Sequence, residues 1–71
     1  MQHKIQLDTM KDIHKFVEIV SRLDEEVLLK DNSGHCVSAK SLMGAIYTME
    51  WSDIYCYCNK DISAFIFPWI I

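Results

Sequence analysis

The stretch Val37-Ser38-Ala39-Lys40-Ser41-Leu42-Met43-Gly44 decides the fold expected for this chain. A strand-like segment ends at Ser38, and Ser41 stands directly before a short apolar run. Serine is a preferred N-cap because its hydroxyl accepts a hydrogen bond from a backbone N–H of the first helical turn. The stretch therefore predicts a strand followed closely by a short helix over residues 42–46. Gly44 lies within that helix, where glycine costs about 1 kcal/mol relative to alanine.

Strand patterns occur on both sides of this stretch. Apolar residues alternate with polar ones over residues 3–7, 26–30 and 54–58, which predicts three further strands. Asp31-Asn32-Ser33-Gly34 is typical of a tight turn, because asparagine tolerates left-handed backbone angles and glycine takes them without steric cost. Residues 35–38 are therefore expected to return antiparallel to residues 26–30.

Two more helices are predicted. The first is the clearest amphipathic helix of the chain, with Thr9 as its N-cap and Asp12 in a variant of the capping box. Its apolar residues recur at helical spacing: Ile13, Phe16, Val17 and Val20. We expect Asp61 to cap a last, short helix, which Pro68 disrupts or ends.

The expected order is strand, helix, strand, strand, helix, strand, helix. This order predicts one α+β domain over residues 1–71, an open-faced sandwich in which a four-stranded antiparallel sheet carries two to three helices on one face. The last segment, residues 64–71, is short and almost wholly apolar. We expect part of it to cover the sheet and the rest to form an exposed apolar patch.

Composition narrows the classes of function. The formal net charge of −3 gives no basic patch, so a nucleic-acid role is not expected. The longest apolar run is far below the roughly 20 residues that a membrane-spanning helix needs. No apolar run follows the N-terminal residues, so we expect no signal peptide and a cytoplasmic location. Three cysteines are an odd number, which favours reduced thiols over a disulfide framework.

Cys56 and Cys58 are interpreted as core residues. Cys56 and Cys58 are two apart on an expected strand and share a face with Ile54. Free cysteine is among the most buried residue types, so packing is the favoured interpretation. A zinc site would need about four ligands, with Cys36 and a histidine joining. Cys-x-Cys on a strand is not a usual zinc spacing, so we expect neither metal nor another cofactor.

The string Lys40-Ser41-Leu42-Met43-Gly44 is similar to the regulatory-serine segment of the HPr family. Members of that family are phosphocarrier proteins of the bacterial sugar phosphotransferase system. The helix text Phe16-Val17-Glu18-Ile19-Val20-Ser21 and the element order also resemble the family, over roughly residues 5–58. The resemblance implies an HPr-like fold and proteins of that system, or a regulatory kinase, as partners.

The chain departs from the family at the active site. In an ungapped match, Thr9 stands at the position of the phosphoryl-accepting histidine, Lys11 at that of the arginine and Asp12 at that of the proline. A threonine hydroxyl needs a base beside it to act as a nucleophile, and Asp12 would repel an incoming phosphate. The resemblance therefore implies a non-catalytic regulatory or interaction variant, and the enzyme class is left open.

Four alternatives stay open at this point. Ser41 is a simple helix cap or also a phosphorylation site for a regulatory kinase. His14 is a surface histidine or, alternatively, an unmatched phosphoryl acceptor of an active phosphocarrier. The family's docking face implies partner binding by Thr9, Lys11, Met43 and Ile46, although the last two are equally suited to the core. The apolar end of the chain is expected to form a homodimer, which would make the protein an assembly module.

Overall fold

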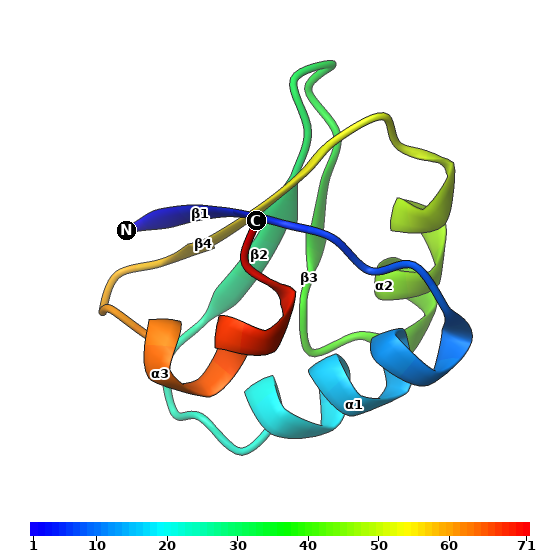
Figure 1. The fold of residues 1–71 in the computed structure, drawn as a ribbon. Helices are drawn as coiled ribbons and strands as arrows, with labels where there is room; N and C mark the ends of the chain where they lie inside the picture. The colour runs from blue at the N-terminus through cyan, green and yellow to red at the C-terminus, as the bar shows by residue number, and fades with distance from the viewer.

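Four antiparallel strands form one sheet in the order β1-β4-β2-β3. The computed structural model describes residues 1–71 (Figure 1). The strands are β1 (Gln2–Ile5), β2 (Val27–Lys30), β3 (Cys36–Ser38) and β4 (Ile54–Cys58). The turn between β2 and β3 contains Gly34 with a positive φ of 99°, the backbone conformation for which glycine was expected there.

Three α-helices accompany the sheet: α1 (Met10–Val20), α2 (Leu42–Tyr47) and α3 (Ser63–Ile66). Two short 3₁₀ turns, η1 (Thr48–Glu50) and η2 (Phe67–Trp69), follow α2 and α3. This confirms the α+β class, the four-stranded antiparallel sheet and the upper number of predicted helices. None of the helices combines the length and apolar character needed to cross a bilayer.

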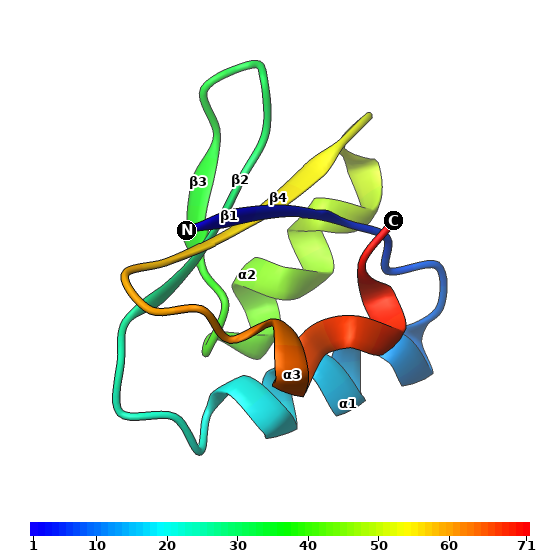
Figure 2. The ribbon, with the colours of Figure 1, turned by 60° about the vertical axis from the view of Figure 1, so that its left-hand side comes forward.

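The register divides the sheet into two faces. Val27 and Leu29 of β2 alternate in burial with their neighbours, as do Ile54, Cys56 and Cys58 of β4. These buried side chains form one core with Ile13, Phe16, Val17 and Val20 of α1, Ala45 of α2 and Ile66 of α3. The helices therefore cover one face of the sheet, and the other face has no covering element (Figures 1 and 2).

The end of the chain packs between α1 and β1. Trp69 is buried against Phe16, with the ring centroids 5.4 Å apart and the planes at 83°. The N–H of Gln6 donates to the carbonyl of Trp69 at 2.8 Å, and Ile70 forms a bridge with Ile5. Phe67, in contrast, is 70% exposed. The expectation that the apolar end is partly packed and partly exposed is confirmed.

Two details differ from the sequence prediction. The first strand ends at Ile5 rather than at residue 7, because the Gln6 N–H turns to the Trp69 carbonyl, although Leu7 is still buried. The N-cap position of α3 is Ile62, not Asp61. The Asp61 carboxylate nevertheless accepts from the N–H of Ser63 at 3.0 Å, so it satisfies a donor of the first turn from one residue further out.

The packing of α2 against β3 explains why a glycine occupies position 44, which the sequence alone did not indicate. A Cβ at this position would lie 3.1 Å from Cβ of Val37 and 3.3 Å from the carbonyl oxygen of Ser38. Both distances are shorter than ordinary van der Waals contact, so a Cβ would force its neighbours to move, and glycine allows α2 to pack closely against β3. Glycine lowers the helix propensity of α2 at this position, and the close packing against β3 offsets that cost.

Candidate functional site

Thr9 stands at the start of α1, where the family resemblance places the phosphoryl-accepting residue. Its backbone is extended, and its Oγ1 accepts a hydrogen bond from the N–H of Asp12 at 3.1 Å. The predicted N-cap is therefore confirmed. The Thr9 hydroxyl has no histidine or carboxylate as a hydrogen-bond partner, so nothing in the structure activates it as a nucleophile.

The surroundings of this helix start are acidic. Asp8 and Asp12 line an open cavity of about 350 Å³ together with residues 68–71. Oδ1 of Asp8 also accepts a hydrogen bond from Nε2 of Gln6 at 2.7 Å. A helix N-terminus attracts anions through its free N–H groups and its dipole. Two carboxylates beside that end oppose this attraction, so the site does not favour a phosphate.

Ser41 caps α2 as the sequence predicted. Its Oγ accepts a hydrogen bond from the N–H of Gly44 at 3.1 Å, and the residue is exposed to solvent. The neighbouring Lys40 is tied down, because its Nζ donates to the carbonyl of Leu23 and its N–H to Oγ of Ser38. The Ser41 hydroxyl is thus both the helix cap and accessible from outside.

His14 lies in the middle of α1, away from either helix end, and it is exposed. Together with Lys15, Val17 and Glu18 it lines a shallow cavity of about 290 Å³, whose other wall is Leu42 at the start of α2. The structure therefore brings the start of α2 next to His14. Thr9 lines none of the cavities of the molecule.

The outer side of α2 carries an exposed apolar row. Met43 is 65% and Tyr47 is 59% exposed, and Leu42 is exposed beside them. Ile46 differs from the expectation of a contact residue, since it is partly buried against the core. Tyr47 was not singled out from the sequence, although its spacing of four residues from Met43 places both on one helix face.

We call this surface the docking face. It consists of Lys11, His14 and Lys15 on the exposed side of α1 and of Leu42, Met43 and Tyr47 on α2. The two helices meet where Leu42 lines a cavity with His14, Lys15 and the acidic Glu18. Helix α2 contains no acidic residue. Of the four contact residues expected from the sequence, Lys11 and Met43 belong to the docking face, Thr9 is the α1 cap and Ile46 is largely turned inward.

Cys56 and Cys58 are core residues, each 1% exposed, as predicted. Burial, and secondarily the neighbouring Cys58, raises the pKa of the Cys56 thiol to about 12, so it stays protonated and weakly nucleophilic. Cys36 is exposed on β3, on the uncovered side of the sheet. The structure holds no group of three or more histidine, cysteine, aspartate or glutamate side chains placed to hold a metal ion.

A polar cluster at the β2–β3 turn was not predicted. Oδ2 of Asp31 lies 2.8 Å from Nδ1 of His35, whose ring stacks on Trp51 with centroids 5.6 Å apart. Desolvation raises the pKa of Asp31, but hydrogen bonds from His35 and Ser33 lower it by more, so the pKa lies below its ordinary value. Asn32 also donates to the Asp53 carboxylate, and the cluster thus fastens the turn to the start of β4.

The structure thus contains two helices with side-chain N-caps, α1 and α2, and one docking face. The HPr resemblance rests on the strings quoted above and on the element order. No protein-family model matches the chain, and no curated protein and no solved structure matches it either.

Proposed function

We propose that this protein is an HPr-like interaction protein related to the bacterial sugar phosphotransferase system, and that it acts in the cytoplasm without carrying phosphate on a histidine. It binds a protein partner of that system through the docking face. The observation that carries the proposal is the exposed apolar row of α2 beside the basic side of α1.

The chemistry of the docking face suits a protein partner. Tyrosine and methionine are enriched in the cores of protein interfaces, whereas charged residues are depleted there and gather at the rim. Met43 and Tyr47 would form the apolar centre, and Lys11 and Lys15 the rim. A partner with an apolar patch bordered by carboxylates would complement this arrangement, and the charges would mainly speed association.

The residues at the start of α1 support a role without phosphoryl transfer. Thr9 replaces the histidine, its hydroxyl is engaged as a cap, and Asp8 and Asp12 stand where a phosphate would need positive charge. Lys11 in place of arginine cannot offer the planar, two-pronged hydrogen bonding of a guanidinium. The enzymatic activity of the family is therefore not part of the proposal.

Ser41 is the proposed regulatory position. Its exposed hydroxyl is reachable by a kinase, and it adjoins Leu42 and Met43 of the docking face. A phosphate adds a charge of about −1.5 to −2 at neutral pH, which would alter partner contacts at this edge. Incubation with an HPr kinase and ATP should give a one-phosphate mass shift that is absent in Ser41→Ala. No shift, or a shift that persists in Ser41→Ala, would remove the regulatory role.

Partner binding is tested by titrating the isotopically labelled protein with the first enzyme of the phosphotransferase system. We expect chemical-shift changes on α2 and the exposed side of α1. Met43→Ser should weaken binding about tenfold, or about 1.4 kcal/mol, because it removes an apolar contact at the centre. Met49→Ser, an exposed methionine outside the face, is the matched control. Changes confined to other surfaces would contradict the proposal.

Phosphoryl transfer is tested separately, with phosphoenolpyruvate and the same first enzyme. We expect no acid-labile phosphate on the protein. Acid-labile phosphate that disappears in His14→Gln would overturn the proposal in favour of an active phosphocarrier. His14 is exposed beside Lys15, so the geometry leaves it accessible, but it is not at a helix end where backbone N–H groups would stabilise the phosphate.

A second candidate is an assembly module that dimerises through the end of the chain. It is favoured by three large apolar side chains that are exposed near the end of the chain, Phe65, Phe67 and Ile71, since exposed apolar surface is typical of interaction sites. Light scattering at high micromolar concentration should then give the mass of a dimer, and Phe67→Ser should shift it toward the monomer. A monomer mass for the unaltered protein at that concentration would contradict this candidate.

A further inference from the structure

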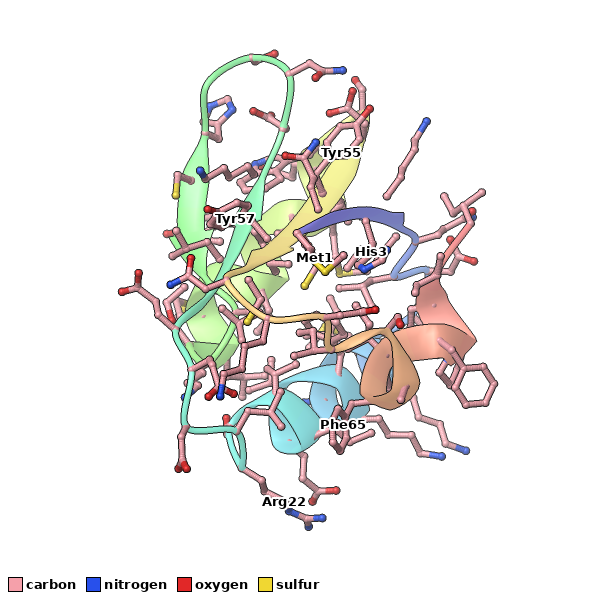
Figure 3. The ribbon with its side chains drawn as sticks, turned by 90° about the vertical axis from the view of Figure 1, so that its left-hand side faces the viewer. Met1, His3, Arg22, Tyr55, Tyr57 and Phe65 are labelled. Atoms are coloured by element: carbon pink, nitrogen blue, oxygen red, sulfur yellow. The ribbon has the colours of Figure 1, made fainter.

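The two outer edges of the sheet differ in whether the chain itself covers them. The order β1-β4-β2-β3 makes β1 and β3 the outer strands, and Figure 3 shows His3 of β1 and the β2–β3 hairpin on opposite sides of β4. The end of the chain covers the outer edge of β1, since the N–H of Ile71 donates to the carbonyl of Lys4 at 3.0 Å. Ile70 forms a bridge with Ile5 at the same edge. The outer edge of β3 pairs with no other segment, and Figure 2 shows no helix beyond it.

The hydrogen bonds at the two ends of β3 show which of its backbone groups point outward. The carbonyl of His35 and the N–H of Ala39 both bond to backbone groups at the ends of β2. The backbone groups of an antiparallel strand face its two sides alternately, so those of Val37 also face β2. The backbone groups of Cys36 and Ser38 therefore face away from β2, toward the open edge.

Three of these outward groups are left without a strand partner. They are the N–H and C=O of Cys36 and the N–H of Ser38, whereas the Ser38 carbonyl accepts from the N–H of Ser41 at 3.2 Å. Natural sheets commonly protect an open edge with charged side chains, proline or a bulge, but β3 contains no charged residue and no proline and is protected only by its short length. An open edge of this kind is a template for pairing with another extended chain.

A cavity of about 290 Å³ adjoins this edge. Its walls come from β3 and the residue before it on one side and from the segment between α2 and β4 on the other: His35, Cys36, Val37, Tyr47, Glu50 and Trp51. Small-molecule sites have volumes of roughly 300–1,000 Å³ and enclose most of the ligand. This open cavity lies below that range, so it suits a single inserted side chain better than a whole ligand.

The register shows how an added strand would reach the cavity. Val37 lies opposite Leu29, which is 0% exposed, so the Val37 side chain is on the covered face of the sheet. Residues that lie directly opposite each other in a sheet share a face. A residue added opposite Val37 would therefore also point to the covered face, where the cavity lies.

The charge of the cavity indicates what accompanies the inserted side chain. Glu50 is the only carboxylate among the lining residues, and it forms no ion pair. The ring of His35 already has partners, since it lies 2.8 Å from Asp31 and stacks on Trp51. On an added strand, the next side chain on the same face is two residues away, or about 7 Å along the strand. A lysine or arginine at that position complements Glu50.

We propose that the outer edge of β3 and the adjoining cavity bind an extended peptide segment of a protein partner. The segment adds an antiparallel strand to β3, inserts an apolar side chain opposite Val37 and presents a lysine or arginine to Glu50. In this mode of recognition the backbone hydrogen bonds provide affinity and the cavity provides specificity. An extended polypeptide is the ligand that offers donors and acceptors in the alternation of β3. With three open backbone groups, binding is weak. This site lies outside the docking face of the proposed function except for Tyr47.

The test is a nuclear magnetic resonance titration of the full chain, with its cysteines reduced, with the acetylated and amidated heptapeptide Thr-Lys-Thr-Phe-Thr-Val-Thr. Its lysine, phenylalanine and valine alternate with threonine and so share one face. Chemical-shift changes are expected on β3, Tyr47 and Glu50. Amide hydrogen exchange gives the direct readout: the N–H groups of Cys36 and Ser38 should become protected when the peptide binds. The N–H of Val37 faces β2 and should be protected without peptide, which makes it the internal control.

Two N-methylated peptides separate backbone pairing from side-chain contact. With the phenylalanine opposite Val37, the threonines on either side of it lie opposite Cys36 and Ser38, and their N–H groups face β3. N-methylation of these two threonines should weaken binding about tenfold or more, because it removes backbone hydrogen bonds. N-methylation of the lysine and the valine instead leaves those bonds intact, since their N–H groups face solvent, and should preserve binding.

The charge contact is tested in the protein. Glu50→Gln should weaken binding of the heptapeptide about threefold, as for an exposed ion pair. It should not affect a heptapeptide with methionine in place of lysine. Glu18→Gln removes an exposed carboxylate on α1, which does not line the cavity, and serves as the matched control.

Three results would overturn the inference. The first is that Cys36 and Ser38 gain no protection at millimolar peptide. The second is that N-methylation of the two threonines leaves binding unchanged. The third is protection of the same two N–H groups without peptide that rises with protein concentration, which would assign the edge to a second copy of this chain. Met43→Ser, which tests the docking face, should not affect peptide binding, and Glu50→Gln should not affect binding of the first enzyme. This inference and the proposed function therefore fail independently.

Discussion

The indole of Trp69 meets the ring of Phe16 edge to face, with centroids 5.4 Å apart and planes at 83°. This contact joins the last turn of the chain to the middle of α1. The edge-to-face arrangement places the positive ring edge against the negative ring face. Because Trp69 also accepts from the N–H of Gln6 through its carbonyl, the contact fixes the path of the chain beside β1.

We predict that Trp69→Ala destabilises the fold by about 3–5 kcal/mol, since it leaves a large cavity against Phe16. A domain of this size has little stability to spare, so the variant should be largely unfolded at room temperature. Urea unfolding followed by far-ultraviolet circular dichroism measures the loss. Phe67→Ala, at a 70% exposed position two residues away, should change the free energy of unfolding by less than about 0.5 kcal/mol. Equal losses for the two variants would contradict the packing described.

The contrast between Trp69 and Phe67 also shows where sequence prediction reaches its limit. Periodicity separates buried from exposed positions when apolar and polar residues alternate, as they do in β4 and α1. Residues 64–71 are nearly all apolar, so the pattern does not indicate which side chains face the core and which face solvent. Which side chains are buried there is decided by contacts with Phe16 and Ile5, which are distant in sequence.

In the candidate site, too, local contacts could be predicted from the sequence and long-range contacts could not. The hydrogen bonds of Thr9 and Ser41 could be predicted because helix caps depend on residues within one turn. The stacking of His35 on Trp51 could not, because it joins the β2–β3 turn to the segment before β4. Neither could the approach of Leu42 to His14, which depends on how α2 packs on α1.

Ser41 leads to a second prediction. Ser41→Ala should lower the free energy of unfolding by about 1 kcal/mol, because the N–H of Gly44 loses its acceptor. Ser41→Asp should retain most of the stability, since aspartate caps equally well and its charge is favourable at a helix start. Ser52→Ala, at an exposed serine whose side chain makes no hydrogen bond, serves as control. If Ser41→Asp is as destabilised as Ser41→Ala, the cap does not contribute as described.

The cysteines lead to a third prediction, on thiol reactivity. Cys36 is exposed, whereas Cys56 and Cys58 are buried and the pKa of Cys56 is raised to about 12. Iodoacetamide reacts with thiolates, so the folded protein should take up one adduct, on Cys36. In concentrated urea all three cysteines should react. Peptide mass spectrometry identifies the modified residue. Modification of Cys56 in the folded protein at the rate of Cys36 would contradict its burial.

The last prediction concerns the acid stability of the β2–β3 turn. The Asp31 side chain is 5% exposed, and its carboxylate accepts from the N–H groups of Ser33 and His35 and meets the His35 ring. The pKa of Asp31 is lower in the folded protein than the ordinary value of an unfolded chain, so the ionised carboxylate stabilises the fold at pH values above that ordinary pKa. This stabilisation is lost as the pH falls through the folded-state pKa. Asp31→Asn should therefore lower the thermal midpoint at neutral pH, and the difference from the unaltered protein should shrink below about pH 4. Asp24→Asn, at an exposed carboxylate without a hydrogen-bond partner, should show neither effect. A difference for Asp31→Asn that stays constant from pH 7 to about pH 2.5 would show that the carboxylate charge does not stabilise the turn.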